Sequence, residues 1–214
     1  MKRYQTIAEL PQSLPVFPLG GALLLPRTEL PLNIFEPRYL ALFEDVIASH
    51  RLVGMIQPLE TEGEKPPLQR VGCVGRVTSF SETDDNRLMV VLTGVCRFDW
   101  TREKKVKTPY RQLDVTYDNF AADLVTDNAA RNVDRDGVVK AFRDFLDANR
   151  MSANWEEVEK VSTEALVNNL SQMAPYPIEE KQALLEAPDL KARAEMLIAL
   201  TELALSKNTT NSLQ

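Results

Sequence analysis

The side chains that most often carry enzyme chemistry are scarce in this sequence. Among its 214 residues there are one histidine, His50, and two cysteines, Cys73 and Cys96. A serine triad requires a general base, but His50 falls at the end of an expected helix and no Gly-x-Ser-x-Gly motif is present. A Ser-Lys dyad stays formally open, because serines and lysines are common. We predict no catalytic residue and interpret His50 as a helix C-terminal residue.

Metal and redox chemistry also have little support. Cys73, Cys96 and His50 cannot supply the four ligands of a structural zinc site at any usual spacing. The two cysteines are expected to face each other in a hairpin, which would permit a strained disulfide, although two reduced core thiols are the simpler interpretation. Asp84 and Asp85 could hold a cation, yet a tight turn already explains them. We predict no metal and no cofactor.

Charge and glycine usage argue against nucleotides and nucleic acids as ligands. None of the eight glycines precedes a lysine, as a Walker A loop requires, and the glycines at 20–21 and 72–75 do not form a Rossmann fingerprint. The net charge of −6 opposes nucleic-acid binding, which needs a basic face. The densest basic run, 102–107, contains Glu103 and is interpreted as a solvated loop or strand edge.

Nothing in the sequence indicates a membrane protein. No stretch reaches the roughly 20 apolar residues of a membrane span, and the first residues, MKRYQTIAELPQ, lack the apolar region of a signal peptide. We expect a soluble, cytoplasmic protein.

The chain divides by composition into two lobes. Prolines and short β-branched runs dominate residues 1–120, whereas helical periodicity dominates residues 132–206. Residues 121–131 are expected to be a linker or crossing segment, and 207–214 a flexible tail. The predicted fold class is α+β: a twisted β pseudo-barrel or sheet with one packed helix, followed by a helical bundle.

The first lobe is expected to contain several short strands and one helix. Short apolar runs predict extended segments at 14–19, 22–25, 28–35, 51–57 and 111–117. Pro37 stands where a helix favours its first residue, and apolar side chains at three-to-four spacing predict an amphipathic helix over 37–50.

A long hairpin gives the clearest prediction of register. Two apolar strands flank the polar turn at 83–86. If paired residue numbers sum to 169, like residues face each other at nearly every position: Val71 with Phe98, Cys73 with Cys96, Val74 with Val95, Gly75 with Gly94, Val77 with Leu92, and Glu82 with Arg87. Apolar pairs on both faces suggest a central, covered hairpin, and the glycine pair permits strong twist.

The second lobe is predicted to be a helical bundle. Apolar positions at helical spacing predict helices over 132–149, from a Ser152 cap to just before Pro175, from Pro177 to Glu186, and over 189–206.

Three segments in the right order resemble the Lon protease N-terminal, or substrate-binding, domain family. They are LPVFPLGGALLLPRTELPLNIFEPRYLALFEDVI over 14–47, VGCVGRVTSF over 71–80 and RLMVVLTGVCRFDW over 87–100. The family has a PUA-like pseudo-barrel followed by a helical lobe. Its full-length members continue into an ATPase module and a Ser-Lys peptidase domain, neither of which this sequence contains.

The resemblance implies a non-catalytic domain that binds unfolded or partner polypeptides, as an adaptor in protein quality control. Glu36, Pro37, Arg38 and Tyr39 match the family's Phe-Glu-x-Arg-Tyr segment, and Gly94, Arg97 and Phe98 match its Gly-x-x-Arg-Phe segment. We interpret these mainly as structural residues, with a recognition patch containing Arg38 or Arg97 as the alternative.

Our hypothesis places the binding surface in a groove between the lobes or at an exposed strand edge, and it is motivated by the stretch 20–27, which contains the apolar run 22–25 beside glycines and prolines. The candidate binding residues are Leu23, Leu24, Leu25, Arg27, Arg38 and Arg97. The alternative for the leucines is that they belong to the core. Two rival functions stay open: a small hydrolase with an unrecognised site, and a subunit that assembles with itself or with a separate ATP-dependent protease. The sequence does not indicate the oligomeric state.

Overall fold

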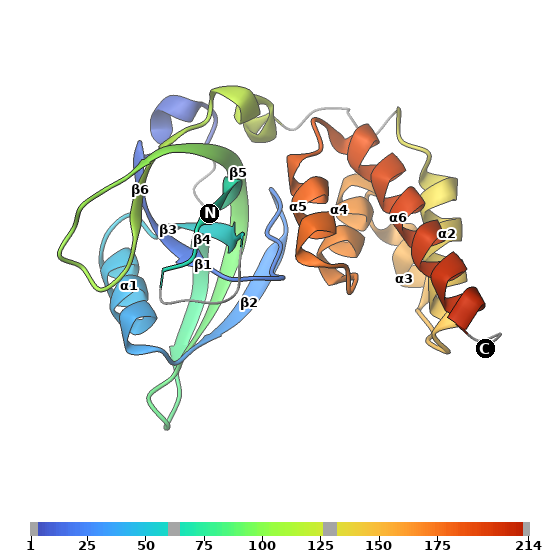
Figure 1. The fold of residues 1–214 in the computed structure, drawn as a ribbon, viewed down its shortest axis with the longest axis horizontal. Coiled ribbons are helices and arrows are strands. Elements are labelled where there is room, and N and C mark those ends of the chain that lie inside the picture. The colour runs from blue at the N-terminus through green and yellow to red at the C-terminus, as the bar shows by residue number, and fades with distance from the viewer. Residues whose placement is uncertain (1–3, 60–64, 126–131, 212–214) are drawn as a thin grey trace. The chain divides into compact units, whose positions relative to one another are not determined.

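The computed structural model describes residues 4–59, 65–125 and 132–211, with side chains described up to residue 206. The chain forms two compact units, Met1–Thr126 and Asp127–Gln214, which we term the β unit and the helical unit. The predicted α+β fold class is confirmed, with the strands in the first unit and a group of helices in the second (Figure 1).

The β unit is a strongly curled, six-stranded mixed sheet with the strand order β2-β5-β4-β3-β1-β6. Its strands are β1 (Ser13–Pro18), β2 (Glu29–Ile34), β3 (Leu52–Pro58), β4 (Leu68–Glu82), β5 (Leu88–Glu103) and β6 (Gln112–Thr116). β6 pairs with β1 and also with the far end of β5. Because β6 pairs with both β1 and β5, the six strands form a curled, twisted sheet rather than a closed barrel, in agreement with the predicted twisted pseudo-barrel or sheet. The predicted extended segment at 22–25 is a loop rather than a strand.

The hairpin of β4 and β5 is the longest pairing in the sheet, and its register was predicted only in part. Gly75 faces Gly94 and Val77 faces Leu92, as expected. The predicted Cys73–Cys96 pair is wrong, because a bulge next to Gly75 shifts the register by one and places Cys96 opposite Val74. A second bulge beyond Val77 likewise places Leu88, rather than Arg87, opposite Glu82. Bulges of this kind increase the twist of a sheet and help it curl.

One helix packs on the sheet, as the sequence predicted. Helix α1 (Pro37–Ala48) begins with proline, whose missing N–H would have no partner in the first turn. Its buried face meets β1 through Phe17, whose ring stands edge-on to Tyr39 at 4.5 Å and to Phe43 at 5.8 Å between ring centroids. Short 3₁₀ helices, η1 (Ile7–Glu9) and η2 (Asp118–Leu124), precede β1 and follow β6.

The helical unit contains α2 (Arg135–Ala148), α3 (Trp155–Lys160), α4 (Thr163–Met173), α5 (Ile178–Glu186) and α6 (Leu190–Asn211). A buried arginine on α6 joins three of them: Arg193 donates to Asn168 Oδ1 of α4 and to the carbonyl of Leu184 of α5, both at 2.9 Å. A buried guanidinium needs such acceptors, so this contact fixes the relative positions of α4, α5 and α6.

The helix expected to start at Ser152 and run without a break towards Pro175 is in fact two helices. Ser162 has extended backbone angles and its hydroxyl accepts a hydrogen bond from the Ala165 N–H at 3.2 Å. Val161, which is also extended, ends the preceding helix, and Ser162 caps α4, because an N-cap residue lies outside the helical region of backbone space. Across the ranges that the structure describes, no helix is both long and apolar enough to cross a membrane.

The glycine pair of the hairpin yields a first prediction. A Cβ atom at Gly94 would lie 2.0 Å from the carbonyl oxygen of Leu25, and the Gly94 backbone also exchanges hydrogen bonds with Arg27 and Thr28. Gly94→Ala must displace this backbone, so we expect a loss of roughly 2–4 kcal/mol in the free energy of unfolding, measured by urea denaturation. Thr93→Ala is the control: it removes only the hydroxyl contact with Thr78 and a β-branched side chain, so we expect a smaller loss of about 1 kcal/mol. Equal losses in both variants would contradict the close-approach argument.

Candidate functional site

The leucines proposed for binding lie inside the β unit. Leu23, Leu24 and Leu25 are 1%, 2% and 0% exposed. Their loop is seated on the glycine pair: a Cβ at Gly75 would lie 2.9 Å from Leu24 Cδ2, and Gly94 touches the Leu25 carbonyl. The leucines thus fit the core alternative that the sequence left open, and they offer no open apolar surface to a partner.

Arg97 is held inside the β unit by a buried ion pair. Its Nη2 donates to Asp123 Oδ1 at 2.8 Å, its Nε to Asp123 Oδ2 at 2.9 Å and its backbone N–H to the same Oδ2 at 3.0 Å. Its guanidinium also lies 4.6 Å from the centre of the Phe120 ring. Arg97 therefore fastens η2 to β5, which matches the structural interpretation of the Gly-x-x-Arg-Phe segment.

Asp123 was expected to lie in the linker at 121–131 but belongs to η2 and to the β unit. The rest of that predicted linker, 126–131, lies outside the described residues.

Arg27 and Arg38 remain at the surface of the β unit. Arg27 has a positive φ of 66° and donates through Nη1 to the carbonyl of Asp123. Arg38 pairs with Glu36 at 2.8 Å and lies 4.6 Å from the centre of the Tyr39 ring. The structure does not bring the six candidate residues together into one surface.

The cysteines and the histidine occupy structural positions. Burial raises the pKa of the Cys73 thiol well above its ordinary value and that of Cys96 to about 12, so both thiols stay protonated. His50 Nδ1 accepts the Leu52 N–H at 3.0 Å, just after the end of α1. Among the described residues no group of three or more His, Cys, Asp or Glu could hold a metal ion.

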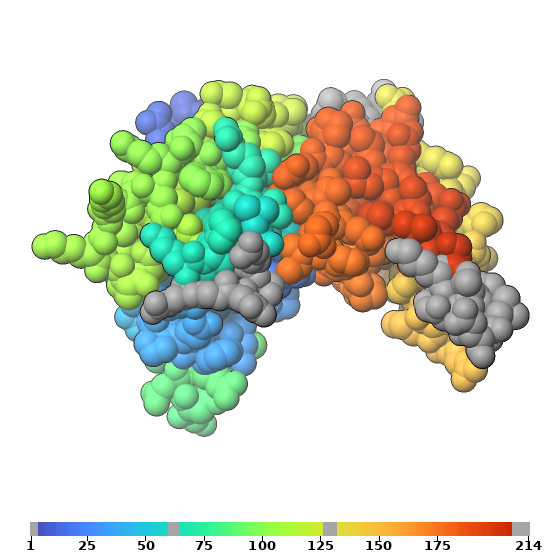
Figure 2. All heavy atoms as spheres, in the orientation of Figure 1, coloured from blue at the N-terminus to red at the C-terminus, as the bar shows by residue number. Residues whose placement is uncertain are grey.

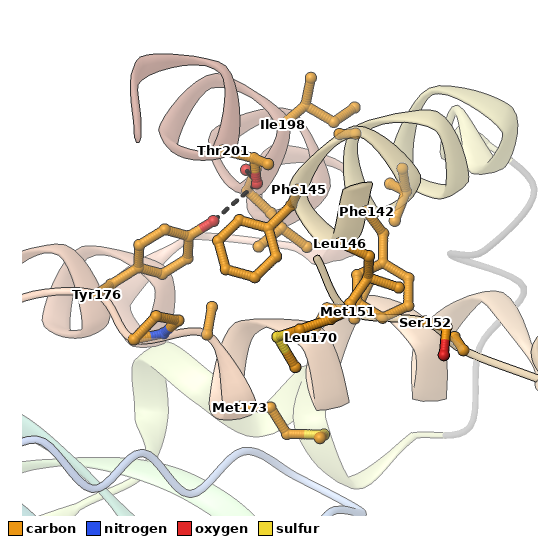
Figure 3. A pocket seen from close by; sticks show the side chains of 16 residues that line it. Phe142, Phe145, Leu146, Met151, Ser152, Leu170, Met173, Tyr176, Ile198 and Thr201 are labelled. Atoms are coloured by element: carbon orange, nitrogen blue, oxygen red, sulfur yellow. Dashed lines mark hydrogen bonds between the residues drawn. The ribbon is translucent and has the colours of Figure 1, made fainter. Parts of the chain in front are cut away.

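The feature best suited to binding is an apolar cleft of about 480 Å³ within the helical unit (Figure 3). None of the described residues that line it carries a charge at neutral pH. They come from α2, the segment that follows it, the end of α4, the segment 174–176 and α6: Val138, Ala141, Phe142, Phe145, Leu146, Met151, Ser152, Ala153, Leu170, Met173, Ala174, Pro175, Tyr176, Leu197, Ile198 and Thr201.

Two of the hydroxyl groups that line this apolar cleft are paired with each other. The hydroxyls of Tyr176 and Thr201 lie 2.7 Å apart, and Thr201 also donates to the Leu197 carbonyl at 2.7 Å (Figure 3). Burial raises the pKa of Tyr176, so its hydroxyl is neutral at physiological pH. With these hydroxyls satisfied, the cleft presents mainly carbon and sulfur to a ligand.

Two methionines that line the apolar cleft are exposed to water. Met151 is 57% and Met173 is 79% exposed, while the Phe142 and Phe145 rings on α2 are half-buried. The chain reaches Met151 through Arg150, whose φ of 55° turns it sharply after α2. The sequence alone does not identify this site, because its apolar positions have the helical spacing of an ordinary core.

Comparison with known proteins gives a consistent result. The family model for the "ATP-dependent protease La (LON) substrate-binding domain" matches residues 13–202. A Lon protease 2 from Myxococcus xanthus is 28% identical over 203 residues, which cover 90% of this chain and 24% of that protein. A Lon protease from Anaeromyxobacter dehalogenans is 27% identical over 200 residues, covering 90% and 23%. The chain thus spans about a quarter of the length of these relatives.

Solved structures show the same fold. A Lon N-terminal domain protein from Xanthomonas campestris has a TM-score of 0.62 at 23% identity, covering 87% of this chain and 97% of that one. The N-terminal domain of a Mycobacterium avium complex Lon protease has a TM-score of 0.64 at 18% identity, covering 89% and 98%.

The buried ion pair gives a second prediction. Asp123→Asn leaves the Arg97 guanidinium buried without a counter-charge, so we expect the free energy of unfolding to fall by about 3–5 kcal/mol in urea titrations. Replacing both partners together, Arg97→Met with Asp123→Leu, should cost less than Asp123→Asn, because no charge is then stranded. A double variant that is less stable than the single one would contradict this account.

His50, as the one histidine in the chain, gives a third prediction. Burial lowers the pKa of His50, so the unfolded chain binds a proton more readily than the folded one. The stability that this difference contributes is present above the ordinary pKa of about 6.5 and is lost as the pH falls through the lower, folded pKa. The urea midpoint of the wild type should therefore fall when the pH drops from about 7.5 to about 5.5.

His50→Asn keeps an acceptor for the Leu52 N–H but does not titrate, so the fall in its urea midpoint should be smaller. Identical pH profiles for the two proteins would show that His50 does not contribute to this dependence.

Proposed function

Because the chain belongs to the Lon substrate-binding domain family, we propose that it is a polypeptide-binding module and that the apolar cleft of the helical unit receives apolar side chains exposed by its partners. The carrying observation is the cleft itself, with Phe142 and Phe145 in its wall and two exposed methionines in its lining. Its volume lies within the range of roughly 300–1,000 Å³ that is usual for ligand sites.

The chemistry of the apolar cleft suits sequence-tolerant recognition. Methionine side chains are flexible and polarizable, so Met151 and Met173 can adapt to apolar groups of different shape. The hydroxyls of Tyr176 and Thr201 satisfy each other and do not impose a polar pattern on the ligand. The cleft therefore selects for exposed apolar surface, the feature that distinguishes an unfolded segment from a folded one.

Binding at the apolar cleft is expected to be weak for any single side chain. Full burial of one large apolar side chain contributes about 1.5–3 kcal/mol, which is much less than a stable complex requires. A partner that offers several such side chains would be captured through repeated, reversible contacts.

A module of this kind would act without catalysis, as an adaptor in protein quality control that presents polypeptides to a separate protease. Its relatives are named as proteases, but the matched region is their substrate-binding domain. A cytoplasmic location stays a prediction from the sequence.

Charged residues at the exposed methionines give the fourth prediction. Met151→Glu combined with Met173→Glu should weaken binding of a reduced, carboxymethylated and therefore unfolded protein by roughly tenfold, because apolar contacts are replaced by carboxylates that resist burial. Both positions are well exposed, so the fold should persist. Fluorescence anisotropy of the labelled unfolded protein gives the affinity, and circular dichroism gives the fold.

Leu203→Glu is the matched control, because Leu203 is an exposed apolar residue on α6 that does not line the cleft. We expect the control to bind as the wild type does. Unchanged affinity in the double methionine variant, or an equal loss in the control, would rule out the apolar cleft as the binding surface.

A further inference from the structure

A second cleft, which we term the basic cleft, lies in the β unit and is lined largely by the connection between β5 and β6. This connection projects from the unit as the yellow-green segment in Figure 2. The basic cleft has a volume of about 730 Å³. Its lining residues are Pro18, Arg38, Tyr39, Lys65, Glu103, Lys104, Lys105, Val106, Thr108, Pro109, Tyr110 and Arg111.

The basic cleft is lined mainly by positive side chains, although the chain as a whole is negatively charged. Its lining contains five cationic side chains and one carboxylate, Glu103, whereas the full sequence has a net charge of −6. The run at 102–107, interpreted from the sequence as a solvated loop or strand edge, forms part of its wall. Concave, like-charged surfaces concentrate the electrostatic potential and attract ligands of opposite sign.

Glu103 is already neutralised by its neighbours. It accepts from Arg111 Nε at 3.1 Å and Nη2 at 2.8 Å, and it pairs with Lys65 at 2.8 Å. Burial alone would raise the pKa of Glu103, but these hydrogen bonds outweigh it and lower the pKa, so the carboxylate stays ionised within the pairs. Arg38 is likewise paired with Glu36.

Lys104 and Lys105 remain available for a ligand. Both are exposed, and neither makes an ion pair with any carboxylate in the part of the chain that the structure describes. Both side chains line the basic cleft, so an anion bound there would gain two counter-charges that no carboxylate of the described residues already satisfies.

The floor and walls of the basic cleft are preformed. Tyr110 donates its hydroxyl to Asp45 Oδ2 of α1 at 2.6 Å, and Arg111 Nη1 donates to the Pro66 carbonyl at 2.7 Å. Burial, together with the hydrogen bond to Asp45, raises the pKa of Tyr110 to about 12, so its hydroxyl stays protonated and keeps donating to Asp45. Thr108 also donates to the Tyr110 carbonyl at 3.0 Å, a local hydrogen bond within the projecting connection.

From this arrangement we propose that the basic cleft binds an acidic stretch of a polypeptide, with two or more carboxylates held by Lys104 and Lys105. A nucleic acid fits less well, because its phosphates extend beyond one cleft and would meet a protein of net negative charge. The inference goes beyond the proposed function, since this cleft selects charge and lies in the other unit.

The test uses the full chain and a fluorescein-labelled peptide of alternating Glu and Ser, followed by fluorescence anisotropy at low salt. Lys104→Glu combined with Lys105→Glu should weaken binding by roughly tenfold, because two attractions become two repulsions. Added salt should weaken binding to the wild type as well. Lys140→Glu combined with Lys160→Glu is the control, since these exposed lysines of the helical unit give the same change in net charge.

The control, and the double methionine variant of the apolar cleft, should bind the acidic peptide as the wild type does. Wild-type affinity in the Lys104/Lys105 variant, or an equal loss in the control, would overturn the proposal. Tighter, Lys104-dependent binding of inorganic polyphosphate or a single-stranded oligonucleotide would assign the basic cleft to phosphate and overturn it too. If the glutamates disturb the fold, glutamines at both positions replace them, with an intermediate loss expected.

Discussion

The β unit depends on the close approach of one loop to one pair of glycines. The loop over residues 22–28 lies directly on the hairpin where Gly75 faces Gly94, and no side chain could occupy either position without moving it. The loop is fixed there by backbone hydrogen bonds between Arg27, Thr28 and Gly94. Because this contact fixes the loop, it buries three leucines that would otherwise form an exposed apolar run, and it covers one face of the hairpin.

The curl of the sheet follows from irregularities on either side of that contact. One bulge lies between Val74 and Gly75, a second between Val77 and Ser79, and a third between Trp100 and Arg102, where β5 pairs with β6. Each adds twist, so one long strand can pair with different neighbours at its two ends. The ion pair between Arg97 of β5 and Asp123 of η2 holds η2 against β5. The β unit therefore extends past its last strand, β6.

The sequence predicted those parts of the fold that local patterns determine. Strand and helix positions followed from proline placement and apolar spacing, and the hairpin register was correct where the two glycines meet. The register failed at Cys73 and Cys96, because a bulge is a backbone choice that the alternation of apolar residues does not record. The burial of Leu23 to Leu25 depends on glycines far along the chain, at 75 and 94. The local apolar run therefore could not show whether these leucines belong to the core or to a binding surface.

The apolar cleft shows a deeper limit of sequence reasoning. Its wall residues have the spacing of core positions, and the sequence does not reveal that the helices leave the space between them partly empty. The available signals were Met151 and Met173, which lie at the ends of predicted helical segments, and a tyrosine between Pro175 and Pro177.

Apolar contact alone would make the chain bind nearly any unfolded segment, because an apolar surface discriminates poorly between partners. A charged site changes this, since like-charge contacts exclude partners as effectively as opposite charges attract them. In a chain of net charge −6, a cluster of cations in a cleft is a local exception that the overall charge conceals. With both clefts on one chain, the apolar cleft would bind exposed apolar side chains and the basic cleft would bind acidic ones. Selectivity for a partner would then come from the combination of the two.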